Sequence, residues 1–109
     1  MDGDLAAWGK AITLEATGRR SGQPRRVVIG FVEDGEALLV AAATETTHWA
    51  QNLLAAPRCQ VELRGRRLAY RARPLLGAEA EAVVVALILK YGTPAERLGD
   101  GPAFRLEPA

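Results

Sequence analysis

Turn signals divide the first half of the chain into short strands that pair most simply with their neighbours in the sequence. Residues 11–17 alternate apolar and polar side chains, which is the period of a half-buried strand. Asp34-Gly35 is a strong hairpin signal between a strand predicted over residues 26–33 and an apolar strand over 37–43. Strands joined by short hairpins pair antiparallel, and this pattern therefore excludes a doubly wound parallel sheet.

The rest of the chain continues this pattern of short strands and adds helices. We predict a helix over residues 4–10, a helix over 47–55, a hairpin of strands over 59–64 and 66–73, a helix over 77–91, and an edge strand over 103–107. The side chains expected to point inward from the hairpin are Val61, Leu63, Leu68 and Tyr70. The class is α+β, a small antiparallel barrel with flanking helices.

The length and composition fit one domain that covers residues 1–109. The chain has 109 residues, of which 49% are hydrophobic and 25% charged, as in an ordinary globular protein. Its longest apolar run, residues 82–89, is much shorter than the roughly 20 residues that span a bilayer. The first residues are acidic, unlike those of a signal peptide. We therefore expect a cytoplasmic protein without a transmembrane segment.

The chain offers few residues for metal binding or for acid–base catalysis. One cysteine, Cys59, and one histidine, His48, provide neither an internal disulfide nor a metal site with the usual ligand spacing. We interpret Cys59 as a small buried side chain and His48 as a polar residue near a helix start. No catalytic residue is assigned. Such a protein either catalyses nothing or leaves the chemistry to a flavin-like cofactor.

The loop over residues 18–26 is the most informative stretch of the sequence. It combines two glycines, which allow a tight backbone, with the hydroxyl of Ser21 and four arginines. Guanidinium forks bind planar oxyanions, and such a loop therefore suits a phosphate or a carboxylate. The alternative is a solvated basic turn whose arginines pair with surface carboxylates. Because no aromatic residues are interleaved with the arginines, we expect no nucleic-acid partner.

Trp49 and Asn52 are three residues apart on the predicted helix over 47–55 and therefore share one face of it. An aromatic ring beside an amide could cover a flat ring ligand. A lone Trp at this spacing is more often part of the core.

Several motifs, in this order and spacing, resemble the deazaflavin-dependent nitroreductase family, whose fold is a split β-barrel. The matching segments are residues 18–25, Asp34-Gly35, the helix residues Trp49, Asn52, Leu53 and Pro57, and the closing run 104–108. The likeness covers nearly the whole chain from Leu14 onward. It implies a small antiparallel split β-barrel with flanking helices.

The resemblance also implies a cofactor and its binding residues. The cofactor is coenzyme F420, a deazaflavin with a phosphate and a polyglutamate tail. Its anionic part would be held by Arg19, Arg20, Ser21, Gly22 and Arg25. Its ring would lie against the strand backbone at Val27, Val28 and Ile29, with Trp49 and Asn52 nearby. The reduced coenzyme would pass hydride to a small electrophile such as a quinone, an enone or a nitro compound.

Two other ligands fit the same fold. FMN is the alternative cofactor, because the arginine loop requires only a phosphate. A non-catalytic carrier of a cofactor or a fatty acid is the third reading, because the tyrosines that close over the substrate in relatives are reduced here to Tyr91.

The helix over residues 77–91 carries branched apolar side chains on every side between Ala82 and Leu89. A small barrel covers one broad face of such a helix, and soluble monomers seldom expose a large apolar patch. We therefore expect both sides to be covered, by a second copy of the chain in a homodimer. The alternative cover is the N-terminal segment with Leu5 and Trp8.

Overall fold

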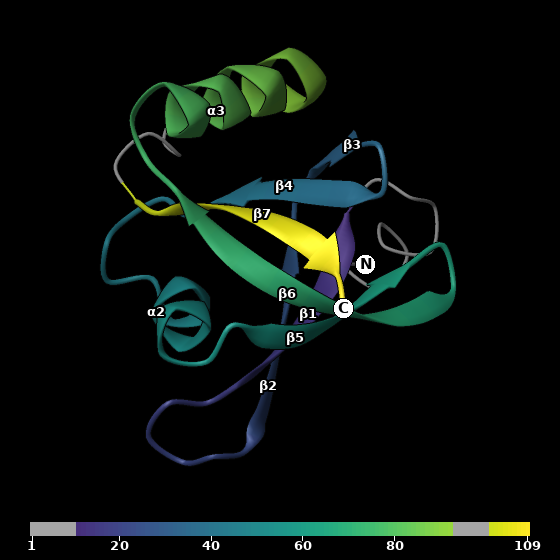
Figure 1. Ribbon diagram of the computed structural model, residues 1–109, viewed down its shortest axis with the longest axis vertical. Helices are drawn as coiled ribbons and strands as arrows, with labels where there is room; N and C mark the ends of the chain where they lie inside the picture. The colour runs from purple at the N-terminus through teal and green to yellow at the C-terminus, as the bar shows by residue number, and fades with distance from the viewer. Residues whose placement is uncertain (1–10, 93–100) are drawn as a thin grey trace.

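The computed structural model describes residues 11–92 and 101–109, in which seven strands form one antiparallel sheet with two helices outside it (Figure 1). The strands are β1 (Ile12–Thr17), β2 (Pro24–Ile29), β3 (Val32–Asp34), β4 (Ala37–Ala41), β5 (Arg58–Leu63), β6 (Arg66–Leu75) and β7 (Ala103–Pro108). The helices are α2 (His48–Ala55) and α3 (Gly77–Tyr91). The α+β class and the antiparallel pairing are confirmed. The helix predicted over residues 4–10 lies outside the described residues.

The strand predicted over residues 26–33 is in fact two strands, β2 and β3. The order in the sheet is β2-β1-β5-β6-β7-β4-β3, and these two consecutive strands therefore form its opposite edges. Gly30 and Phe31 connect them, and Phe31 is fully buried. The sheet must curl to bring its two edges to this short connection, which produces a split barrel. The sequence prediction was wrong because the apolar run gives no sign of a change of partner strand.

The last turn of α3 holds this connection in place. The hydroxyl of Tyr91 accepts a hydrogen bond from the Phe31 N–H at 3.1 Å and donates one to the Phe31 carbonyl at 3.2 Å. Lys90 Nζ donates to the same carbonyl at 2.7 Å and lies 3.6 Å from the centroid of the Phe31 ring. A Cβ on Gly30 would lie 3.0 Å from the Tyr91 ring, and a larger residue here would therefore force the ring to shift by a few tenths of an ångström.

Strand β7, predicted as an edge strand, lies inside the sheet between β6 and β4. Its Phe104 and Leu106 are fully buried in the main core, together with Ile12 and Leu14 of β1. The prediction was wrong because a strand's position in the sheet depends on tertiary pairing that a local pattern does not contain. The alternation predicted over residues 11–17 is confirmed, because Ile12, Leu14 and Ala16 are buried and the residues between them are less so.

The hairpin of β5 and β6 turns at Arg64 and Gly65, both with positive φ. Val61 and Tyr70 are buried as predicted, whereas Leu68 is 46% exposed. Leu68 shares the face of β6 that carries Tyr70 and lies opposite the buried Val61, yet its own side chain is not packed into the core. The prediction for Leu68 was therefore wrong.

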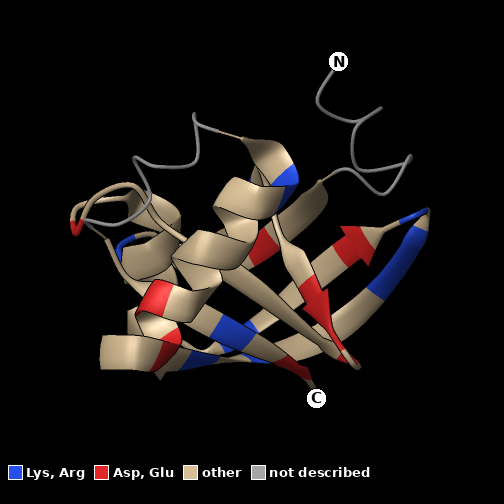
Figure 2. Cartoon of the chain, turned by 90° about the horizontal axis from the view of Figure 1, so that it is seen from above, with Lys and Arg blue, Asp and Glu red and all other residues tan. Residues whose placement is uncertain are grey.

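Helix α3 packs on the sheet through one side only. Val83 and Leu87 are buried against β4 and β7, while Val85 is 56% and Leu89 is 83% exposed. The expectation that both sides are covered is therefore not met within the described part of one chain. Figure 2 shows acidic residues near the start of α3 and a basic residue near its end, the arrangement that favours the helix dipole. Among the described residues, no helix is long and apolar enough to cross a membrane.

The central position of β7 predicts a large effect of truncating its buried aromatic side chain. Phe104→Ala is expected to lower the free energy of unfolding by about 3–5 kcal/mol, because it leaves a cavity between the two sides of the barrel. The control Leu68→Ala, at the exposed end of the hairpin, is expected to cost less than about 1 kcal/mol. Urea denaturation followed by circular dichroism measures both. Equal losses would contradict the assignment of β7 to the core.

Candidate functional site

A cleft of about 600 Å³ lies between the loop after β1, the start of β2 and the first two turns of α2. Its lining residues are Gly18, Arg19, Arg20, Ser21, Arg25, Arg26, Val27, His48, Trp49 and Asn52. Seven of these were candidates from the sequence: Arg19, Arg20, Ser21, Arg25, Val27, Trp49 and Asn52. The structure therefore brings together two motifs that are separated by more than twenty residues in the chain.

Three of the sequence candidates lie outside this lining. Gly22 faces a second hollow on the other side of the loop. Val28 is paired with Thr13 and shares its outward direction, because side chains alternate along a strand. Ile29 packs against the main core. Any contact of Val28 or Ile29 with a ligand in the cleft would have to come from the backbone.

The loop is held in one shape by its own backbone and by Ser21. The N–H of Gly18 donates to the Gln23 carbonyl at 2.8 Å, and that of Gly22 donates to the Gly18 carbonyl at 2.8 Å. Ser21 Oγ accepts a further hydrogen bond from the Gln23 N–H at 3.2 Å. A Cβ on Gly18 would lie 2.8 Å from Ser21 Oγ and 3.2 Å from the Gln23 carbonyl oxygen, and a larger residue would therefore displace the Ser21 side chain that holds the loop.

Asn52 connects the loop to helix α2. Its Oδ1 accepts two hydrogen bonds from Arg19, one from the backbone N–H at 3.1 Å and one from Nη1 at 2.8 Å. The side chain of Asn52 is only 4% exposed, and the amide therefore serves the loop rather than solvent. This pair fixes one arginine of the cleft before any ligand arrives.

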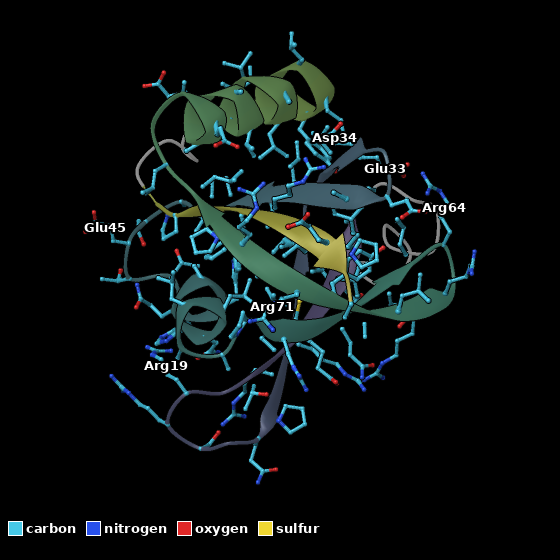
Figure 3. The ribbon with its side chains drawn as sticks, viewed as in Figure 1. Arg19, Glu33, Asp34, Glu45, Arg64 and Arg71 are labelled. Carbon is cyan, nitrogen blue, oxygen red and sulfur yellow. The ribbon has the colours of Figure 1, made fainter. Side chains whose placement is uncertain are left out.

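The cleft is positively charged, because three of the four arginines that line it lack carboxylate partners among the described residues. Among the described residues, no carboxylate pairs with Arg19, Arg20 or Arg25. Arg25 Nη2 donates to Ser21 Oγ at 3.4 Å, and Arg19 Nη2 lies 3.4 Å from Nδ1 of His48 (Arg19 is labelled in Figure 3). The alternative prediction was a solvated turn whose arginines pair with surface carboxylates. Of the four loop arginines, Arg26 alone does so, through its ion pair with Glu15. These free guanidinium groups favour an anionic ligand.

The opposite wall of the cleft is apolar. Trp49 is half-buried, and its ring centroid lies 6.0 Å from that of Phe104 at a tilt of 52°. Val27 lies on the strand that faces it. Trp49 thus packs partly against the core and partly lines the cleft. The cleft suits a ligand with an anionic end and a flat, less polar end.

The described residues around the cleft supply no pair for acid–base catalysis. His48 is exposed at the start of α2 and has Arg19 rather than a carboxylate beside it. Burial raises the pKa of the Cys59 thiol to about 11, which keeps it protonated and unreactive. Chemistry in this cleft therefore depends on what it binds.

Residues 3–95 match the model of a protein family described as F420H(2)-dependent quinone reductase. The chain belongs to this family. It is a deazaflavin-dependent oxidoreductase with coenzyme F420 as its cofactor, and the resemblance that the loop motif indicated is confirmed.

Solved structures with the same fold support the family assignment. An F420-H2-dependent reductase (FDR-A) is 25% identical, with a TM-score of 0.75 over 90% of this chain and 94% of that one. A domain-swapped dimer is also 25% identical, with a TM-score of 0.73 over 90% and 80%. The heme storage protein HutZ from Vibrio cholerae, at 18% identity and a TM-score of 0.76 over 98% and 87%, shares the fold alone. The split-barrel prediction is confirmed.

The residues of the cleft fit an F420-type ligand. Arginines and a serine hydroxyl gather at the loop, where a phosphate would need donors, and Trp49 with Val27 forms a wall against which a flat ring can lie. Gly18, Arg26 and His48 also line the cleft but were not among the sequence candidates. Gly18 and Arg26 belong to the arginine loop over residues 18–26, and they could therefore have been predicted from that motif. Nothing in the sequence pointed to His48 as a cleft residue.

The bond between the loop and α2 predicts a stability effect. Asn52→Leu would leave the partly buried Arg19 N–H without its acceptor and is expected to lower the free energy of unfolding by about 1 kcal/mol. The control Asn52→Asp keeps an acceptor for both Arg19 donors and is expected to lose less. Urea denaturation measures both variants. Wild-type stability in the leucine variant would show that this bond does not hold the loop.

Proposed function

We propose that the cleft binds coenzyme F420 with the phosphate at the arginine loop and the ring between Trp49 and β2. The observation that carries this proposal is the set of guanidinium groups without carboxylate partners beside an apolar wall. Arg20 and Arg25 make no hydrogen bond to another described element, and their guanidinium groups bind the phosphate. Arg19, which is hydrogen-bonded to Asn52, keeps the loop in place. The bound, reduced coenzyme supplies the hydride.

The edge position of β2 supports a role for its backbone. Within residues 11–92 and 101–109 this strand pairs with β1 alone, which leaves alternate N–H and C=O groups along its other side available to a ligand. We propose that these groups between Val27 and Ile29 hold the polar edge of the deazaflavin ring. The side-chain directions of Val28 and Ile29 do not oppose this role, because the contact uses main-chain atoms.

The acceptor we propose is a small conjugated electrophile: a quinone, an enone or a nitro compound. The family description favours a quinone. Conjugated acceptors take up hydride without a strong acid–base pair beside them, and the described residues of the cleft offer no such pair. The protein then acts mainly by binding, by orientation and by exclusion of water.

We place the reaction in the cytoplasm. Cys59 is a free, buried thiol whose neighbours contain no second cysteine, and the fold therefore needs no oxidising compartment.

Coenzyme binding is tested by fluorescence titration with oxidised and reduced F420. Wild-type protein is expected to show a saturable change at micromolar coenzyme. The double variant Arg20→Gln/Arg25→Gln is expected to bind at least about tenfold more weakly, because each arginine gives a charge-assisted hydrogen bond. Arg66→Gln is the matched control, since it removes one exposed arginine from the β5–β6 hairpin, away from the cleft. Equal affinity in all three proteins, or tighter binding of FMN than of F420, would contradict the proposal.

We further propose that the chain forms a homodimer through the exposed side of α3. Val85 and Leu89 lie on this side with Leu76 just before the helix, and all three expose large apolar surfaces. The structural relative that is a domain-swapped dimer supports pairing of such chains. A second copy would cover an apolar stripe that one barrel leaves open.

The dimer is tested by light scattering over a concentration series. Val85→Asp/Leu89→Asp is expected to give the mass of one chain, because pairing would bury two carboxylates without partners, while the wild type has twice that mass. Leu87→Asp is not a suitable probe, since Leu87 is 1% exposed inside the protomer and its replacement would disturb the fold itself. A wild-type mass of one chain at every concentration would overturn the dimer and favour cover by the N-terminal segment.

A further inference from the structure

His48 lines the cleft, and the proposed function gives it no role. It is the first residue of α2 and directly precedes Trp49, whose ring forms the apolar wall. In the turn before the helix, the Thr47 N–H donates to the Thr44 carbonyl at 3.3 Å. On the other side, Arg19 Nη1 donates to the His48 carbonyl at 3.5 Å. The position of His48 at the cleft is therefore set by the fold before any ligand arrives.

The contact with Arg19 decides which ring nitrogen of His48 can donate a hydrogen bond. Arg19 Nη2 lies 3.4 Å from His48 Nδ1. A guanidinium has donors only, and the contact is therefore favourable when Nδ1 carries a lone pair. The ring proton is then on Nε2. His48 thus offers a ligand in the cleft one uncharged N–H donor.

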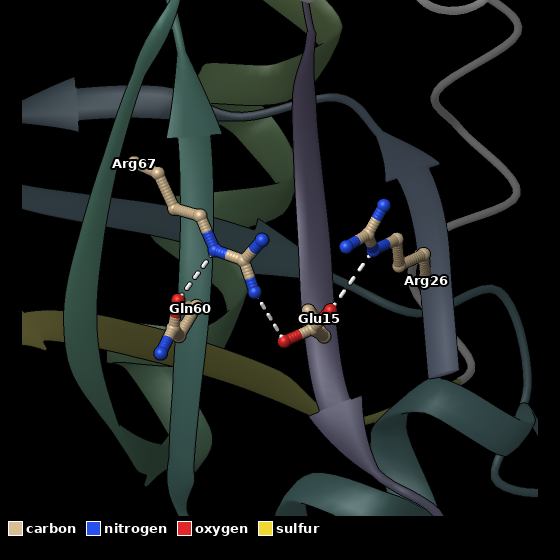
Figure 4. Close-up of polar contacts among 4 residues, drawn as sticks. All are labelled: Glu15, Arg26, Gln60 and Arg67. Atoms are coloured by element: carbon tan, nitrogen blue, oxygen red, sulfur yellow. Dashed lines mark hydrogen bonds and ion pairs between the residues drawn. The ribbon is translucent and has the colours of Figure 1, made fainter. Parts of the chain in front are cut away.

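The arginines that line the cleft have other partners. Arg19 donates to α2 at 2.8 Å, and Arg26 donates through Nε to Glu15 of β1 at 2.9 Å (Figure 4). The two remaining arginines of the loop are those proposed to bind the phosphate. By contrast, Nε2 of His48 has no hydrogen-bond partner among the described residues. This donor is therefore available to a second molecule in the cleft.

That second molecule is the acceptor, which must lie against the deazaflavin ring, because hydride transfer needs reacting atoms roughly 3–3.5 Å apart. The ring is proposed to lie against Trp49, and His48 is the neighbouring residue. When a quinone or an enone is reduced, the bond from hydrogen to the coenzyme breaks and a bond from that hydrogen to the acceptor forms. The coenzyme is oxidised, and the electron pair displaced in the conjugated acceptor moves to its oxygen. A fixed N–H donor stabilises the negative charge that develops there.

We propose that His48 is an acceptor-binding residue whose Nε2–H donates a hydrogen bond to the carbonyl oxygen of a quinone or an enone. The proposal rests on the proposed function, because the acceptor is held against the ring of a coenzyme bound in the cleft. The acceptor oxygen takes its proton from water, and the His48 ring keeps its own. The residue thus orients carbonyl acceptors and stabilises their developing charge without acting as an acid.

Steady-state kinetics with reduced F420 and duroquinone compare two variants of this residue. His48→Phe keeps a ring but removes the donor, and it is expected to lower kcat/KM for duroquinone about tenfold, the effect of one hydrogen bond to a charged oxygen. The matched control His48→Gln has an amide N–H at the end of a side chain of similar length and is expected to keep most of the activity. Fluorescence titration is expected to give the same coenzyme affinity for both variants as for the wild type. Circular dichroism checks that each variant is folded.

Nitrogen NMR observes the His48 ring directly, because the chain contains one histidine. Protein made with isotope-labelled histidine is expected to carry the ring proton on Nε2. Duroquinone added to protein loaded with oxidised F420, in which no turnover occurs, is expected to shift the Nε2 signal more than the Nδ1 signal. A ring proton on Nδ1, or an Nε2 signal that stays unchanged when the quinone binds, would overturn the proposal.

The outcomes separate the role of His48 from the proposed function. Equal kcat/KM in the wild type and His48→Phe, or equal losses in both variants, would overturn the role of His48 while coenzyme binding stands. If the wild-type protein binds no coenzyme, the proposed function fails, and duroquinone titrated alone into the labelled protein tests His48. A saturable shift of Nε2 then supports the contact with the acceptor, and the absence of a shift overturns it.

Discussion

The functional architecture depends on the pair of hydrogen bonds that Asn52 accepts from Arg19. The loop after β1 is exposed and basic, and its arginines repel one another. Asn52 of α2 is buried, and its side-chain amide is uncharged. It can therefore accept hydrogen bonds without the free-energy cost of burying a charge. By binding both the backbone and the guanidinium of Arg19, it fixes the loop over the helix and leaves Arg20 and Arg25 free for a ligand. The loop's own hydrogen bonds give it its shape, and the bonds to Asn52 place that shape over α2 so that the two form one cleft.

The barrel provides the place where the loop and the helix can meet. Because β2 and β3 form opposite edges of the sheet, the chain between them must curl, and Lys90 and Tyr91 hold that curl through the backbone of Phe31. Among the strands that the structure describes, the same arrangement leaves one side of β2 unpaired. The charged groups then divide between two faces. The cleft keeps arginines without carboxylates, while the outer face neutralises most of its arginines across the strands and leaves Arg58 and Arg71 unpaired.

The sequence predicted those features that depend on local pattern or on a family motif. The arginine loop, the Trp49–Asn52 spacing and the bounds of α3 are of this kind, and the structure brings the first two into one cleft. The order of the strands could not be predicted from the sequence. The positions of β7 and of the two strands on either side of Gly30 depend on pairing between segments that are distant in the chain. The role of Asn52 was also missed, since an amide that could face a ligand looks the same in sequence as one that holds a loop. One side of α3 stays exposed because a single small barrel can cover only one face of the helix. The sequence of the helix, which is apolar on every side, does not show which face is covered.

Binding of F420 in the cleft is the central claim, and an NMR titration of the isotope-labelled protein with oxidised F420 tests it most directly. Backbone amide signals of the loop and strand over residues 18–29, and of α2 from His48 to Asn52, are predicted to shift together and to saturate at one coenzyme per chain. The amides of the exposed side of α3 are predicted to stay in place. Saturable shifts that leave the loop and α2 unchanged, or no shifts at all, would contradict the account.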